Sequence, residues 1–115
     1  MTITPEQLRI IAEARGWRFV EDAHEASRMF QRSLRGYWHR DGEGSVNYRD
    51  VPAYHTDPAL NYELEAEANI ETWRDIAEKR WYSAIVGGTC TVNADTPLEA
   101  RCLAYLAWLE ERYGD

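Results

Sequence analysis

The sequence has few of the residues that build most catalytic and metal sites. It contains two cysteines and three histidines in 115 residues, and the cysteines lack the spacing of a metal site. It has no phosphate-binding glycine loop, no Gly-x-Ser-x-Gly turn and no His-Glu-x-x-His pair. We therefore predict no catalytic residue, no metal and no cofactor. Free cysteine is among the most buried residue types, so we expect Cys90 and Cys102 to face inward as reduced thiols; a disulfide or a reactive thiol is the alternative.

Long apolar runs are also missing from the sequence. No stretch approaches the length of a membrane span, and the chain starts with a capped helix rather than an apolar leader. We expect a cytoplasmic protein without a membrane contact. A chain of 115 residues, 44% hydrophobic and 29% charged, has the size and composition of one globular domain, which we place at residues 1–115.

Basic residues are outnumbered by acidic ones. The formal net charge is −7, which argues against non-specific binding of nucleic acid. The charge is unevenly spread along the chain. Residues 1–40 hold seven arginines and five acidic residues, a net charge of +2, whereas residues 41–115 hold six basic and fifteen acidic residues, a net charge of −9.

The clearest structural pattern lies between residues 80 and 113. Residues 80–94 alternate in character around Gly87-Gly88, which predicts a β-hairpin with Ser83 opposite Val92. Thr96-Pro97 and Glu99 then predict a capped helix. Its apolar side chains recur at helical spacing: Leu98, Cys102, Tyr105, Leu106 and Leu109. We expect this helix to cover one face of a small antiparallel sheet.

Three more helix starts precede this unit: Thr4-Pro5, Asp22 and Asp57-Pro58. On the last of these helices we expect a buried stripe, with Glu63, Glu65 and Glu67 facing water. Residues 70–76 fit either a helix or a strand; we favour a third strand, because a two-stranded ribbon is only marginally stable. Residues 37–54 read as a loop region with a short strand at residues 46–48. The predicted class is therefore α+β, with a small antiparallel sheet of two to four strands covered by about four helices.

Basic residues recur on one face of the second predicted helix. Arg28, Arg32 and Arg35 lie at helical spacing, and His39 follows. These residues form a candidate anion site, for example for phosphate. The simpler interpretation is a solvated face that pairs with the acidic third helix.

Three clusters of residues stand out in the sequence: Gly36-Tyr37-Trp38, Val51-Pro52-x-Tyr54-x-Thr56-Asp57-x-Ala59 and Ala94-Asp95-Thr96-x-x-x-Ala100-x-Cys102. Together they resemble a known family, the phage ABA sandwich domain. The similarity covers residues 34–113, and residues 1–20 form an N-terminal helical extension without a counterpart. The resemblance implies a small protein encoded by a phage or prophage, with helices packed on an antiparallel sheet. The family has no established activity, so it implies no catalytic residues.

Two functions follow as hypotheses. The first is a non-enzymatic, acidic phage accessory protein that binds a host or defence-system protein; an anti-CRISPR or other anti-defence inhibitor is its sharpest form. Its candidate partner-binding residues are Glu63, Glu67, Glu71 and, if it is exposed, Trp38. The sequence also leaves open whether the protein forms a homodimer. The second is a small enzyme or ligand-binding domain that holds an anionic ligand with the arginine stripe and a histidine. We expect no direct contact with nucleic acid in the first case.

Overall fold

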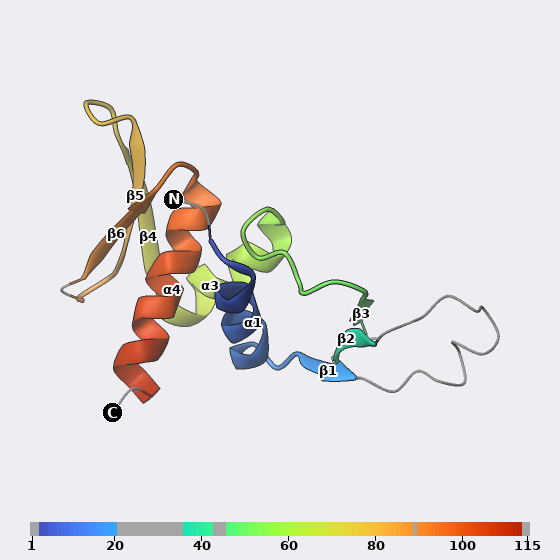
Figure 1. Ribbon diagram of the computed structural model, residues 1–115. Coiled ribbons are helices and arrows are strands. Elements are labelled where there is room, and N and C mark those ends of the chain that lie inside the picture. Colours follow the sequence, from blue (N-terminus) through green and yellow to red (C-terminus); the bar gives the residue numbers. More distant parts are fainter. Residues whose placement is uncertain (1–2, 21–35, 43–45, 89, 114–115) are drawn as a thin grey trace.

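Two antiparallel sheets and three helices make up the part of the chain that the computed structural model describes, residues 3–20, 36–42, 46–88 and 90–113 (Figure 1). In chain order the elements are α1 (Pro5–Ala14), β1 (Arg18–Val20), β2 (Tyr37–Arg40), β3 (Val46–Tyr48), α3 (Pro58–Ala68), β4 (Ile70–Asp75), β5 (Arg80–Ile85), β6 (Thr91–Ala94) and α4 (Pro97–Tyr113). The α+β class is as predicted. The strands form two sheets instead of one, and the described helices are fewer than the four expected. The helix predicted from Asp22 lies outside the described residues.

The second sheet has the strand order β4-β5-β6, and α4 crosses one of its faces (Figure 1). Its register places Ser83 opposite Val92, as the alternation predicted, and Ile70 opposite Ile85. Ile70 and Ser83 are buried on the face toward α4. The prediction that this helix covers one face of the sheet is therefore confirmed. Residues 70–75 supply the third strand.

Asn69 explains why residues 70–75 form a strand and do not continue α3. It adopts the left-handed conformation, with φ 57° and ψ 58°, which asparagine tolerates better than most residues. Its N–H donates to the carbonyl of Glu65 at 3.0 Å and closes the helix, while its own carbonyl accepts from Val86 N–H at 2.9 Å. The chain thus passes from helix to sheet within one residue.

Helix α4 begins and packs as its sequence indicates. The Thr96 hydroxyl accepts from the Glu99 N–H at 3.1 Å, so threonine satisfies one of the free amides at the helix start. Cys102 and Tyr105 are fully buried, and Leu109 is nearly so. The same holds for the other two caps: Thr4 forms a capping box with Gln7, and the Asp57 carboxylate accepts from the Ala59 N–H at 2.9 Å.

The hairpin between β5 and β6 differs from the prediction at its turn. The Gly88 N–H donates to the Ile85 carbonyl at 2.8 Å, so the turn is centred on Val86 and Gly87. The ladder ends at the pair of Ala84 with Thr91, and Cys90 precedes β6 with its side chain exposed. The expectation that both thiols face inward is therefore wrong for Cys90. The strand pairing ends at Thr91, so the alternation of side chains that predicted an inward Cys90 does not extend to it.

The first sheet, β1-β2-β3, draws two of its strands from residues 37–54, which were predicted to be a loop region with a short strand. Phe19 pairs with Trp38, and Trp38 with Tyr48 on its other side. Gly36 allows the chain to enter β2 close to β1: a Cβ there would lie 2.5 Å from the Phe19 ring and 2.7 Å from the Val20 carbonyl oxygen. The short strand predicted at residues 46–48 is present.

The hydrophobic core lies among the three helices and the inner face of β4-β5-β6. The stripe predicted on α3 is buried in it together with one face of α1: Leu60, Leu64 and Ala68, and Leu8, Ile11 and Ala12. Tyr54, just before α3, and Tyr105 of α4 are the largest fully buried side chains. Both carry a hydroxyl that needs a partner, and these partners define the site described below.

The two thiols should react very differently with a thiol reagent. Burial raises the pKa of the Cys102 thiol to about 12, and the reagent attacks only a thiolate that it can reach. We expect Cys90 to be labelled at once in the native protein, and Cys102 only after unfolding. A Cys90→Ser variant should lose the fast phase. Rapid labelling of both thiols in the native wild-type chain would contradict the burial of Cys102.

Candidate functional site

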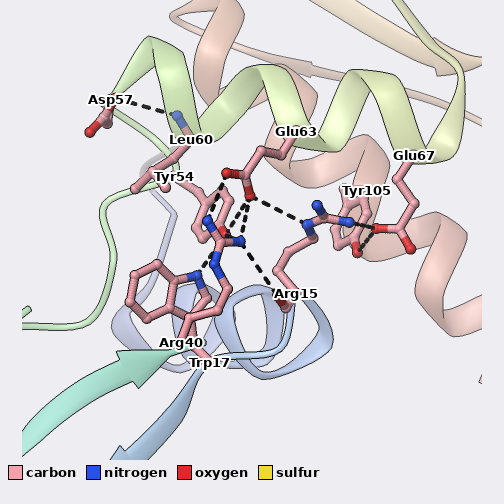
Figure 2. Close-up of polar contacts among 9 residues, drawn as sticks. All are labelled: Arg15, Trp17, Arg40, Tyr54, Asp57, Leu60, Glu63, Glu67 and Tyr105. Carbon is pink, nitrogen blue, oxygen red and sulfur yellow. Dashed lines mark hydrogen bonds and ion pairs between the residues drawn. The ribbon is translucent and has the colours of Figure 1, made fainter. Parts of the chain in front are cut away.

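Glu63 of α3 is the centre of a network of charged and phenolic side chains (Figure 2). Arg40, the last residue of β2, donates from Nη1 to Glu63 Oε1 at 2.8 Å and from Nη2 to Oε2 at 2.9 Å. The Tyr54 hydroxyl donates to the same Oε1 at 3.1 Å. One carboxylate therefore links the first sheet, the segment before α3 and α3 itself, through a bidentate pair of the kind that arginine and carboxylate favour.

Arg15 carries the network from Glu63 to Glu67. It is the C-cap residue of α1, and its Nε lies 3.5 Å from Glu63 Oε1. Its Nη1 is paired with Glu67 Oε1, which also accepts from the Tyr105 hydroxyl at 2.6 Å. Glu63 and Glu67 are four residues apart, so they lie on one side of α3. Figure 2 shows Arg15 lying between them.

Trp17 completes the network beneath Tyr54 and Arg40. Its indole Nε1 donates to the Tyr54 hydroxyl at 2.9 Å, so this hydroxyl accepts from Trp17 while it donates to Glu63. The Arg40 guanidinium lies over the Trp17 ring, 4.7 Å from its centroid. Trp17 directly precedes β1 and Arg40 ends β2, so the cation–π contact helps to fix the position of the first sheet.

The charges of this network balance internally. Burial acts to raise the pKa of Glu63, but the hydrogen bond and charge of Arg40, with smaller effects from Tyr54 and Arg15, outweigh it, and the pKa is lowered. Burial is the main cause that raises the pKa of the Tyr54 and Tyr105 phenols. At neutral pH Glu63 is therefore charged and both phenols are protonated. Such groups suit the joining of elements better than acid–base catalysis, which needs a group that titrates near the working pH.

The structure revises the surroundings of two predicted partner-binding residues. Glu63 was expected to face water, but only 26% of its side chain is exposed, and its carboxylate is paired with Arg15 and Arg40. Trp38 was considered as an exposed anchor in a loop, but it is buried in β2 at 6% exposure, with its ring against Phe19. Glu67 is paired as described above, whereas Glu71 is exposed on β4.

Of the four residues of the predicted anion site, the structure describes only His39. Arg28, Arg32 and Arg35 lie outside the described residues. His39 of β2 has its Nε2 2.7 Å from Asp41 Oδ1, a carboxylate that would compete with an anionic ligand. This site stays a prediction. Within the described chain the acidic helix α3 pairs with other arginines that the sequence analysis did not select: Arg15, Arg40 and Arg101.

The face of the β4-β5-β6 sheet turned away from α4 carries an aromatic pair. Trp73 and Tyr82 are opposite each other in the ladder, and their rings stack with centroids 6.0 Å apart and planes inclined by 15°. Trp73 is 41% exposed. By strand alternation the same side carries a mixed set of neighbours, and we call the whole set the outer sheet face: Glu71, Trp73, Asp75, Arg80, Tyr82, Ala84, Thr91 and Asn93. No described helix covers it (Figure 1).

Two further observations bear on function. Among the described residues, no three His, Cys, Asp or Glu side chains are grouped so that they could hold a metal ion. No helix in that part of the chain combines the length and apolar character that crossing a membrane requires.

The chain matches no family model, no curated protein and no solved structure.

Removing the charge of Glu63 should destabilise the fold. Glu63→Gln leaves Arg40 and Arg15 without their shared carboxylate, and we expect the free energy of unfolding to fall by about 2 kcal/mol, the range for hydrogen bonds to partly buried charges. Glu65→Gln is the matched control, because Glu65 pairs with Arg101 at 3.3 Å and its side chain is 41% exposed, so we expect a loss of about 0.5 kcal/mol. Urea denaturation measures both; equal losses would contradict the role of Glu63.

The contribution of Glu63 should also depend on pH. Its pKa is lowered in the folded state, so its stabilisation is present above the pKa of the unfolded chain and is lost as the pH falls through the folded value. We expect the stability difference between wild type and Glu63→Gln to shrink between about pH 6 and pH 3. Denaturation at a series of pH values tests this, and a difference that grows on acidification would refute it.

Proposed function

We propose that this chain is a non-enzymatic binding protein that docks a partner protein on the outer sheet face. The observation that carries the proposal is the stacked pair of Trp73 and Tyr82 on a sheet face that no described helix covers. Folding normally buries large aromatic rings, and tryptophan and tyrosine dominate the binding energy of protein interfaces.

The aromatic pair is arranged before any partner arrives. Each ring is held by its strand and by the other ring, and the Tyr82 hydroxyl also donates to the Glu78 carboxylate. A partner that covers these rings would therefore immobilise few additional side chains. Such preorganisation reduces the entropy lost on binding.

The charges beside the pair favour a basic partner surface. Glu71 and Asp75 lie on the same strand and on the same side as Trp73. Arg80 is already engaged, because it donates to Asn93 Oδ1 at 2.6 Å and to Asp95 Oδ1 at 2.7 Å. Acidic groups around a stacked pair would repel phosphates, which argues against the rings serving as a platform for nucleic-acid bases. Opposite charge on a protein partner would instead speed and orient docking.

The resemblance to the phage ABA sandwich domain suggests the biological setting. We propose that the partner is a host or defence-system protein of the bacterial cytoplasm, and an anti-CRISPR or other anti-defence inhibitor is the sharpest version. The net charge of −9 over residues 41–115 supports this, because an acidic protein can occupy the basic groove in which a nucleic-acid enzyme holds its substrate. Binding of this type should weaken as salt increases.

The test compares two variants that each remove one exposed aromatic ring. Trp73→Ala removes a ring from the outer sheet face, and Tyr62→Ala removes a ring that is 64% exposed on α3. Tagged wild type and both variants are used to capture proteins from bacterial lysate, and the partner found is then titrated in purified form. We expect Trp73→Ala to weaken binding by about 2 kcal/mol, roughly thirtyfold, and Tyr62→Ala to leave it unchanged.

Two experimental results would contradict the proposal. A partner that binds wild type and Trp73→Ala equally tightly does not use the outer sheet face. Catalytic turnover of a small substrate by the purified chain would instead favour the enzyme hypothesis.

A further inference from the structure

A groove lies between α1 and α4, away from the outer sheet face. Its volume is about 750 Å³, within the range of ligand sites. Its apolar lining comes from Ile10 and Ala14 of α1 and from Leu106 and Leu109 of α4. Ile10 is 44% exposed even though it belongs to the helix whose opposite stripe fills the core. We call this surface the α1–α4 groove.

Among the described residues, the charged groups that line the α1–α4 groove are all carboxylates. Glu13 of α1, Glu67 of α3 and Glu110 of α4 border it. Glu13 is paired with Arg9 one turn earlier, an exposed pair of small energy that a partner's cation can replace. Glu67 takes its bonds from Arg15 and Tyr105 on Oε1. Glu110 is exposed and forms no ion pair within the described chain.

The end of α1 strengthens the negative potential at this place. Glu13 and Ala14 belong to its last turn, which has no basic residue, whereas the last turn of α4 contains Arg112 as well as Glu110. The carbonyls of a last turn carry a partial negative charge. An apolar floor with a negative border thus selects a ligand that is apolar along one side and cationic along its edges.

We propose that the α1–α4 groove binds a basic amphipathic helix of a partner protein. Its lining comes from α1, α4 and Glu67 of α3, helices whose backbone groups are already hydrogen-bonded, so it offers no strand edge to an extended peptide. A helix with aliphatic side chains at spacings of three and four fills such a groove. A second copy of this chain fits less well, because two copies of net charge −7 repel each other.

The probe is a labelled synthetic helix of about 15 residues, four turns, with leucines along one side and lysines along the other. Fluorescence anisotropy measures its affinity for the full chain. Glu110→Lys should weaken binding about fivefold and reduce its salt dependence, whereas Glu111→Lys, the same charge change on the neighbouring exposed residue outside the groove, should have little effect. Ile10→Asp should weaken binding about tenfold, and Ile76→Asp, at an isoleucine 83% exposed in the β4–β5 loop, should not.

Three results would overturn the proposal. One is equal binding by Glu110→Lys and Glu111→Lys, and another is equal affinity for a peptide with glutamates in place of the lysines. The third is a dimer of the chain, seen by sedimentation, that Ile10→Asp dissociates, since a second copy would then occupy the groove. Trp73→Ala should leave peptide binding intact, so the groove and the outer sheet face stand or fall separately. Circular dichroism checks that each variant is folded.

Discussion

The arrangement of this molecule depends on one partly buried carboxylate, that of Glu63. A charge removed from water is costly unless hydrogen bonds and an opposite charge replace the lost solvent. Here the replacement comes from Arg40 at the end of β2, Arg15 at the end of α1 and Tyr54 before α3. These three groups belong to different elements, so satisfying one carboxylate fixes how the first sheet sits against the helices. Apolar packing would hold the elements together, but it would not select this orientation as sharply.

Because the charges of the Glu63 network are paired with one another, we look for binding surfaces elsewhere on the molecule. The arginines and glutamates at the centre of the described chain neutralise one another, and the phenols between them stay protonated. Within the described chain, the apolar surface left exposed includes the outer sheet face with Trp73 and Tyr82 and the α1–α4 groove with Ile10, besides separate exposed side chains such as Tyr62 and Ile76. The outer sheet face and the groove both have acidic neighbours. The binding function that we propose rests on these two surfaces.

Local patterns predicted the helix starts and the C-terminal hairpin. Neighbouring residues were enough for the register of Ser83 with Val92 and for the caps at Thr4, Asp57 and Thr96. The strand at residues 70–75 fitted a helix equally well by pattern and was favoured only because a two-stranded ribbon is marginally stable. The first sheet and the Glu63 network depend on pairings between distant segments, such as Arg40 with Glu63, 23 residues apart, and a single sequence does not record these. Glu63 and Glu67 at a spacing of four were visible as a helical pair, yet the acidic pattern indicated a solvated face. Cys90 was misplaced because alternation does not say where a ladder stops.

Native-state hydrogen exchange on wild type and Glu63→Gln tests the central claim most directly. If Glu63 fixes the first sheet to the helices, the substitution should lower the protection of amides in β1, β2 and β3 more than that of amides in α4 and β4-β5-β6. Protection lost equally across the whole chain, or unchanged in the first sheet, would show that apolar packing sets this arrangement and that the carboxylate is incidental.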